Sequence, residues 1–116
     1  MIVAKFYQKN RDGSIHMNLK GHAQAAPKGE DLICASATML AYTVAQAVTF
    51  MFEQGMLKKK PKIFIKNGEA VIVATPQDES RAEVLHTFWV AQCGIHVLVH
   101  NYPQNVKLEH LKDVKA

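Results

Sequence analysis

The sequence has few cysteines, and this scarcity excludes two common architectures of small proteins. It contains only Cys34 and Cys93, with no Cys-x-x-Cys pair, so a disulfide framework and a structural zinc ribbon are both excluded. Free thiols are typical of a reducing cytosol. The first residues include Lys5 and form no long apolar run, which argues against a secretory signal. We therefore expect a cytoplasmic protein.

Charged residues are also limited, at 21%, while apolar residues make up 48% of the chain. This balance is typical of an ordinary globular protein and excludes wholesale disorder. The length of 116 residues suits one domain, and we expect residues 1–116 to form it. The net charge of +4 is compatible with a nucleic-acid partner but does not require one.

One uncharged run, residues 32–52, is long enough to span a bilayer. It nevertheless contains five polar residues, namely Ser36, Thr38, Thr43, Gln46 and Thr49. A helix that is apolar almost all round is typical of a protein core or of an oligomer interface. We therefore expect no membrane span, and we expect this helix to contribute to a homodimer.

Strands are indicated by alternating apolar residues on either side of tight turns. Residues 2–7 and 14–20 flank Asp12-Gly13, and residues 63–65 and 70–74 flank Asn67-Gly68, which predicts two hairpins. Residues 105–109 favour a final strand.

Two helices are expected between these strands. The first runs from about residue 32 to Glu53, with Asp31 as its N-cap and Gly55 as its stop signal, after a loop at 21–31. The second covers about 78–99 and places Trp89 in the core. The order ββαββαβ predicts an α+β two-layer sandwich with a mainly antiparallel sheet and two helices.

His22 and Cys34 are the most informative pair for chemistry. If the helix begins near residue 32, Cys34 lies in its first turn, where free N–H groups and the helix dipole favour a thiolate. The N–H groups near Cys34 and Ala35 could also stabilise an oxyanion. A flexible loop could bring His22 back to this cysteine. From the spacing alone, an inert buried cysteine and a surface-loop histidine are the favoured interpretation.

Two other clusters of residues are weaker candidates for a functional site. Cys93, His96 and His100 share a helix face and could bind zinc, but no fourth ligand is evident and we expect no metal site. Lys58, Lys59, Lys60 and Lys62 could touch RNA or an acidic partner, although such a cluster is typical of a solvated turn.

Residues 21–40, GHAQAAPKGEDLICASATML, resemble the motif of the bacterial ribosomal-processing cysteine protease family, Prp. The matching positions are Gly21-His22-Ala23, Gly29, Asp31 and the segment Leu32-Ile33-Cys34-Ala35. The opening strand, the Asn67-Gly68 hairpin and the segment 102–106 resemble the same family, so the likeness covers the whole chain.

The resemblance implies a homodimeric, cofactor-free cysteine endopeptidase that removes the N-terminal extension of a bacterial large-subunit ribosomal protein. It implies Cys34 as the nucleophile and His22 as the general base. The supporting or substrate-binding positions are then Gly21, Gly29, Asp31, Ala35, Ser36 and Thr38. The alternative is a non-catalytic ribosome-associated factor that binds RNA through its positive charge.

Details around the dyad stay open at this point. The family commonly has a smaller residue than Ser36 and a serine in place of Thr38, so rate and substrate preference could differ. Asp31 could orient His22, but an N-cap role is the simpler interpretation. The loop at 23–30 is a candidate lid over bound peptide.

Overall fold

The computed structural model describes residues 1–22 and 27–110, and the order of elements confirms the predicted ββαββαβ arrangement. The elements are β1 (Ile2–Gln8), β2 (Ile15–Lys20), α1 (Pro27–Glu53), β3 (Lys62–Lys66), β4 (Glu69–Ala74), a short 3₁₀ turn η1 (Asp78–Ser80), α2 (Arg81–Asn101) and β5 (Val106–His110). The α+β class is therefore confirmed.

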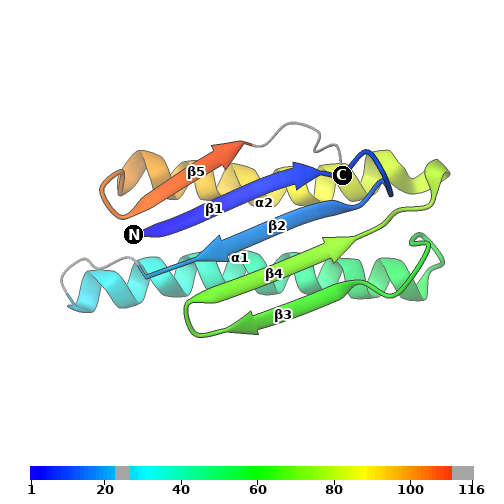
Figure 1. Cartoon of the computed structure of the whole chain (residues 1–116). Coiled ribbons are helices and arrows are strands. Elements are labelled where there is room, and N and C mark those ends of the chain that lie inside the picture. The colour runs from blue at the N-terminus through cyan, green and yellow to red at the C-terminus, as the bar shows by residue number, and fades with distance from the viewer. Residues whose placement is uncertain (23–26, 111–116) are drawn as a thin grey trace.

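The five strands form one sheet in the order β3-β4-β2-β1-β5. All neighbouring strands are antiparallel except β1 and β5, which run parallel from the pair Ile2 and Val106. Both helices lie on one face of this sheet, as Figure 1 shows, and α1 packs beside α2. The opposite sheet face is not covered by any element that the structure describes.

The core fills the space between the sheet and the helices. Alternate strand residues such as Ala4, Met17 and Ile72 are fully buried, because one face of each strand points to the helices. Val48 and Ile95 meet them from α1 and α2. Burying an aliphatic side chain of this size contributes about 1.5–3 kcal/mol, so this layer supplies much of the stability.

The first helix begins earlier than predicted. It starts at Pro27 and ends at Glu53, so the predicted end is correct, and Gly55 follows with a φ of 77°. Asp31 therefore lies inside the helix, and its predicted role as N-cap is wrong. Proline and glycine at 27–29 resemble loop signals, but proline is well suited to the first helical position.

The outer side of the helical layer is strongly apolar. Trp89 was expected in the core, yet 57% of it is exposed. Six other large hydrophobic residues of the two helices are more than half exposed, namely Leu32, Met39, Tyr42, Phe50, Val90 and Val97. Leu32–Glu53 and Asp78–Asn101 are long and apolar enough to cross a membrane, a test that core helices also pass. Here each helix buries one side against the sheet.

Candidate active site

Cys34 and His22 line the same cavity, which has a volume of about 270 Å³. Cys34 is half-buried on α1, whereas His22 is exposed just after the end of β2. The opposite wall is the β3–β4 turn. The remaining lining residues are Ile2, Leu19, Gly21, Ala37, Thr38, Tyr42, Ile65, Lys66, Asn67, Gly68, Glu69 and Ala70.

One row of side chains along α1 forms the helical wall. Cys34, Thr38 and Tyr42 follow one another at intervals of four residues, so their side chains stack on the same side of the helix. Thr38, one of the predicted supporting positions, carries a hydroxyl and lies in the cavity. Tyr42 belongs to the same row and was not predicted.

The backbone conformation of Gly21 determines where the chain places His22. Its φ is 104°, and a Cβ on it would lie 2.2 Å from the carbonyl oxygen of Met1. Its N–H also donates to the carbonyl of Gly68 at 2.9 Å. A side chain at position 21 would therefore collide with backbone, which explains why glycine precedes this histidine.

Gly68, in the β3–β4 turn, lies directly beside the imidazole of His22. It has a φ of 83°, and a Cβ placed on it would come within 2.8 Å of His22 Nε2. The imidazole thus lies directly against a backbone position that has no side chain. The Asn67-Gly68 pair was recognised in the sequence as a turn, but nothing in its local pattern indicated that it forms a wall of the site.

The cavity combines an apolar floor with a charged rim. Ile2, Leu19 and Ile65 supply hydrocarbon side chains. At the rim, Lys66 Nζ lies 3.9 Å from Glu69 Oε1. This arrangement can accept an apolar peptide side chain while the scissile bond lies beside Cys34.

Not every predicted position belongs to the cavity. Ala35 and Ser36 are exposed and do not line it, and Ser36 Oγ donates to the carbonyl of Leu32 at 2.8 Å. Gly29 lies within the first turns of α1 rather than in a loop. The side chain of Asp31 and residues 23–26 of the predicted lid lie outside the described part of the chain, whereas 27–30 are helical.

The early start of α1 also overturns one prediction about the chemistry. Cys34 is the eighth residue of the helix and not the third, because the helix begins at Pro27. The free N–H groups and the dipole effect are confined to the first turn. The backbone N–H groups of Cys34 and Ala35 are therefore committed to the helix and cannot form the predicted oxyanion site.

Neither of the two other clusters lines this cavity. Among the described residues, no three His, Cys, Asp or Glu side chains are grouped to hold a metal ion, including Cys93, His96 and His100. Lys58 forms an exposed ion pair with Asp78 at 3.4 Å. Exposed pairs of this kind contribute little to stability.

A thiol and an imidazole that line the same cavity are the two kinds of side chain that a cysteine-protease dyad requires. The fold and the cavity thus indicate the class of cysteine proteases. The chain belongs to the cysteine protease Prp family, because the model of that family matches residues 1–107. The resemblance seen in the sequence is thereby confirmed.

Solved structures show the same fold. A ribosomal processing protease Prp from S. aureus, in complex with a covalently linked product peptide, matches with a TM-score of 0.65 and 19% identity over 96% of this chain and 100% of that chain. The SMU.848 protein from Streptococcus mutans matches with a TM-score of 0.65 and 20% identity over 97% and 96% of the two chains. No curated protein matches.

Proposed function

We propose that this cysteine protease removes the N-terminal extension of a bacterial large-subunit ribosomal protein, with Cys34 as nucleophile and His22 as general base. The observation that carries the assignment of the dyad is that both side chains line one cavity. The similar S. aureus protein is a ribosomal processing protease and has been solved with a substrate peptide and with a product peptide. Those complexes support a peptide substrate for this chain.

The reaction proceeds through an acyl-enzyme. His22 removes the proton from Cys34 Sγ, and the thiolate attacks the carbonyl carbon of the scissile bond. The tetrahedral intermediate collapses, the C–N bond breaks, and His22 gives its proton to the leaving amine. Water, deprotonated by His22, then hydrolyses the thioester and restores the thiol. The sequence of steps uses these two side chains and needs no cofactor.

Side chains, rather than the helix N-terminus, are the candidates for stabilising the oxyanion. Thr38 is one helical turn from Cys34 and carries a hydroxyl, and Asn67 carries an amide on the opposite wall. Both can donate a hydrogen bond to charge that develops beside Cys34. The extra methyl group of threonine, compared with serine, narrows the same space and so affects which peptide fits.

A cleavage assay read by mass spectrometry tests the dyad and the substrate together. The full chain is mixed with the full-length ribosomal precursor, beside Cys34→Ala, His22→Ala and a Cys93→Ala control. We expect one N-terminal cut that either dyad substitution slows at least about a thousandfold and that Cys93→Ala leaves intact. Cleavage that survives Cys34→Ala would contradict the assignment of the nucleophile, and an uncut precursor with folded, reduced enzyme would contradict the substrate.

We also propose that residues 1–116 form one catalytic domain that works as a cytoplasmic homodimer. The apolar outer side of the helical layer supports the dimer, since exposed patches of this kind commonly mark interaction sites. The cytosol suits an enzyme whose nucleophile must remain a reduced thiol.

A further inference from the structure

The face of the sheet that lies away from the helices has a regular pattern of lysines. The strand registers align its residues in rows across the sheet. The row nearest the active site reads Lys66, Glu69, Lys20, Val3 and Lys107 from β3 to β5. The next reads Phe64, Val71, Asn18, Lys5 and Glu109, and the third reads Lys62, Val73, His16 and Tyr7.

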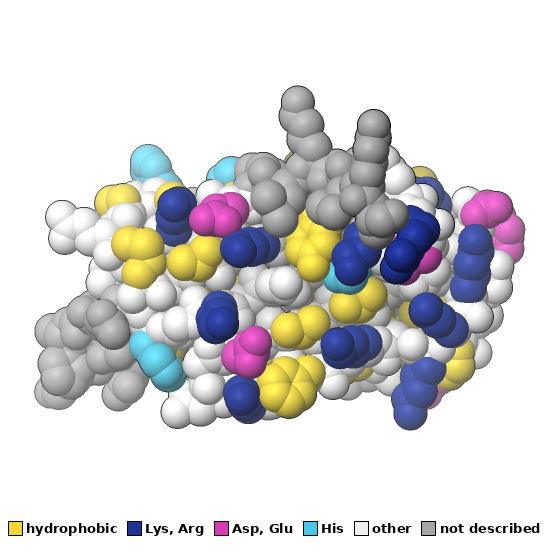
Figure 2. Space-filling model, in the orientation of Figure 1, with side chains coloured by type: hydrophobic (Ala, Val, Ile, Leu, Met, Phe, Trp, Pro, Cys, Tyr) yellow, Lys and Arg dark blue, Asp and Glu magenta, His cyan; other side chains and the backbone are white. Residues whose placement is uncertain are grey.

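The charge on this face is strongly one-sided. This face has five lysines and two glutamates and therefore a net charge of +3, whereas the whole chain has a net charge of +4. Figure 2 shows these cations distributed over the sheet rather than gathered at one edge. By contrast, among the helical side chains that the structure describes, Arg81 is the only lysine or arginine. Such segregation attracts a polyanion to one side of the molecule.

The two glutamates neutralise only part of this charge. Glu109 is shared by Lys5 and Lys107, at 3.7 and 3.6 Å, and Glu69 lies 3.9 Å from Lys66. Lys20 and Lys62 form no ion pair with any carboxylate in the described part of the chain, and both are exposed. These two ammonium groups are available to phosphates, and Lys5 and Lys107 together carry one more positive charge than Glu109 neutralises.

Aromatic side chains lie among the lysines on this face. Phe64 is 43% exposed between Lys62 and Lys66, and Lys66 Nζ lies 5.4 Å from its ring centroid. Tyr7 reaches from β1 to stack on His16 of β2, with ring centroids 4.4 Å apart and an angle of 11° between the planes. Aromatic rings on an open sheet are surfaces on which unpaired bases stack.

A hollow of about 600 Å³ on the same face adds a polar group. It is lined by Lys5, Lys20 and Asn18, among others, and Asn18 Oδ1 is buried there with no hydrogen-bond partner among the described residues. An acidic protein partner would bind through the lysines alone. Lysines combined with stacking rings match the phosphates and the ring faces of a nucleic acid.

We propose that the open face of the sheet binds single-stranded RNA, with phosphates on Lys20, Lys62 and Lys107 and bases stacked on Phe64 and Tyr7. This binding is a second activity and does not depend on the proteolytic reaction. The row that begins with Lys66 and Glu69 also borders the cavity of Cys34. Bound RNA would therefore hold the protease beside a substrate that is itself associated with RNA.

Fluorescence anisotropy of a labelled oligouridylate of about ten nucleotides tests this proposal on the full chain. Lys62→Gln with Lys107→Gln removes two phosphate contacts at positions outside the cavity. We expect weaker binding and a log–log salt slope reduced by about 1.4, because each contact to a single strand contributes about 0.7. Phe64→Leu should weaken binding about tenfold without changing that slope, since stacking releases no counterions.

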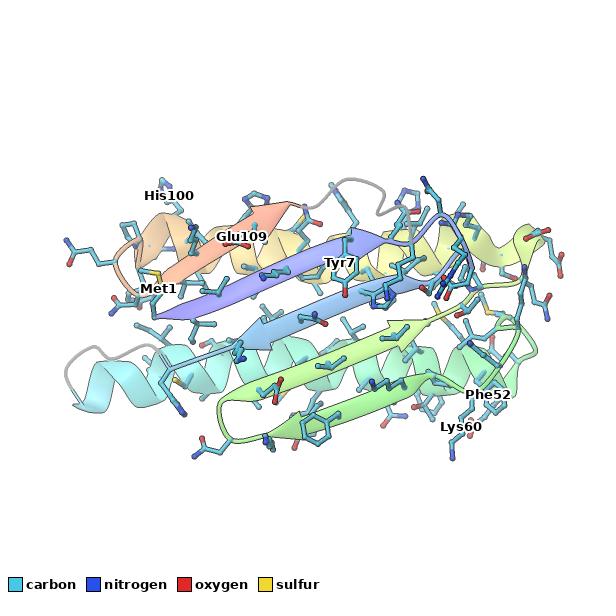
Figure 3. The ribbon with its side chains drawn as sticks, in the orientation of Figure 1. Met1, Tyr7, Phe52, Lys60, His100 and Glu109 are labelled. Atoms are coloured by element: carbon cyan, nitrogen blue, oxygen red, sulfur yellow. The ribbon has the colours of Figure 1, made fainter. Side chains whose placement is uncertain are left out.

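The matched control is Lys59→Gln with Lys60→Gln, which removes the same charge from the turn that precedes β3 (Figure 3). We expect this control to bind nearly as well as the unaltered chain. The proposal would be overturned if the control lost as much affinity for RNA as the variant with Lys62→Gln and Lys107→Gln, or if the unaltered chain did not bind RNA. It would also be overturned if Phe64→Leu bound RNA with unchanged affinity, because the surface would then bind any polyanion through charge alone. Circular dichroism of every variant confirms that it is folded.

Discussion

At the scale of single residues, two glycines set the surroundings of the proposed base. Gly21 brings the chain past the carbonyl of Met1, and Gly68 leaves room for the imidazole of His22. Neither glycine takes part in the chemistry. They decide where the ring can lie, and a catalytic ring that is misplaced by about 1 Å can lose a hundredfold in rate.

Gly68→Ala should therefore reduce activity more than stability. The new Cβ would lie 2.8 Å from His22 Nε2, so the ring must move. We expect kcat/KM for peptide cleavage to fall between about tenfold and a hundredfold. The left-handed backbone adds a cost of about 1–2 kcal/mol in the free energy of unfolding.

Gly55→Ala is the matched control, because Gly55 has a similar φ of 77° and nothing lies within 4 Å of its added Cβ. It should lose comparable stability in urea unfolding and keep its cleavage rate. If both variants cleave equally well, Gly68 does not position His22.

At the scale of elements, the β1–β2 hairpin is held by a chain of hydrogen bonds at its turn. Ser14 donates its single hydroxyl proton to Asp12 Oδ1 at 2.6 Å, so His16 Nε2–H donates to Ser14 Oγ at 2.7 Å. The hydrogen bonds from Ser14 lower the pKa of Asp12 to about 2. Burial lowers the pKa of His16, which favours the neutral form of its ring within the sheet face.

The stability of the fold should decrease as the pH falls below about 6.5. Burial, reinforced by Lys9 and Lys62 and opposed by Asp12, lowers the pKa of His16 from its ordinary 6.5. The unfolded chain then binds a proton at a pH where the folded chain does not, so acid favours unfolding. Asp12, with its pKa near 2, stays ionised throughout this range.

Urea unfolding at about pH 7.5 and about pH 5 measures this effect. His16→Gln should remove part of the difference between the two pH values, whereas His86→Gln, at an exposed site on α2, should not. An identical pH dependence in His16→Gln and the unaltered chain would show that His16 is not the group responsible.

The two helices pack closely because one of them contains a glycine. A Cβ on Gly94 would lie 2.7 Å from Leu40 Cδ2. Glycine weakens an isolated helix by about 1 kcal/mol relative to alanine, and here the contact between α1 and α2 compensates.

At the scale of the whole molecule, the two sides are chemically opposite. The helical side is apolar, and the sheet side has most of the positive charge. The cavity of Cys34 lies at the boundary, where α1 meets the β3–β4 turn. Pairing two copies through their helices would leave both sheet faces and both cavities accessible.

Val97→Glu should therefore separate the dimer. Val97 is 58% exposed on the helical side, and a carboxylate there would be buried without a partner when two copies meet. Sedimentation velocity at micromolar concentration should show a particle of twice 12.9 kDa for the unaltered chain and a monomer for the variant. Ile63→Glu, at an exposed apolar site on β3, should remain dimeric. A monomeric unaltered chain would contradict the homodimer.

Local patterns in the sequence were sufficient to predict the order of the elements and the class of enzyme. Alternation, the two glycine turns and the uncharged run are properties of neighbouring residues, and the GHA…DLICA motif identified the family. The end of α1 at Glu53 was also predictable, since Gly55 follows it.

The surroundings of the proposed dyad depend on contacts that form only when the whole chain is folded. The register of the hairpins brings Gly68 against His22, and the early start of α1 removes Cys34 from the helix N-terminus. The exposure of Trp89 and the parallel pairing of β5 with β1 likewise depend on contacts between distant segments. Such contacts reflect the free energy of packing the whole chain, which no local pattern of residues encodes.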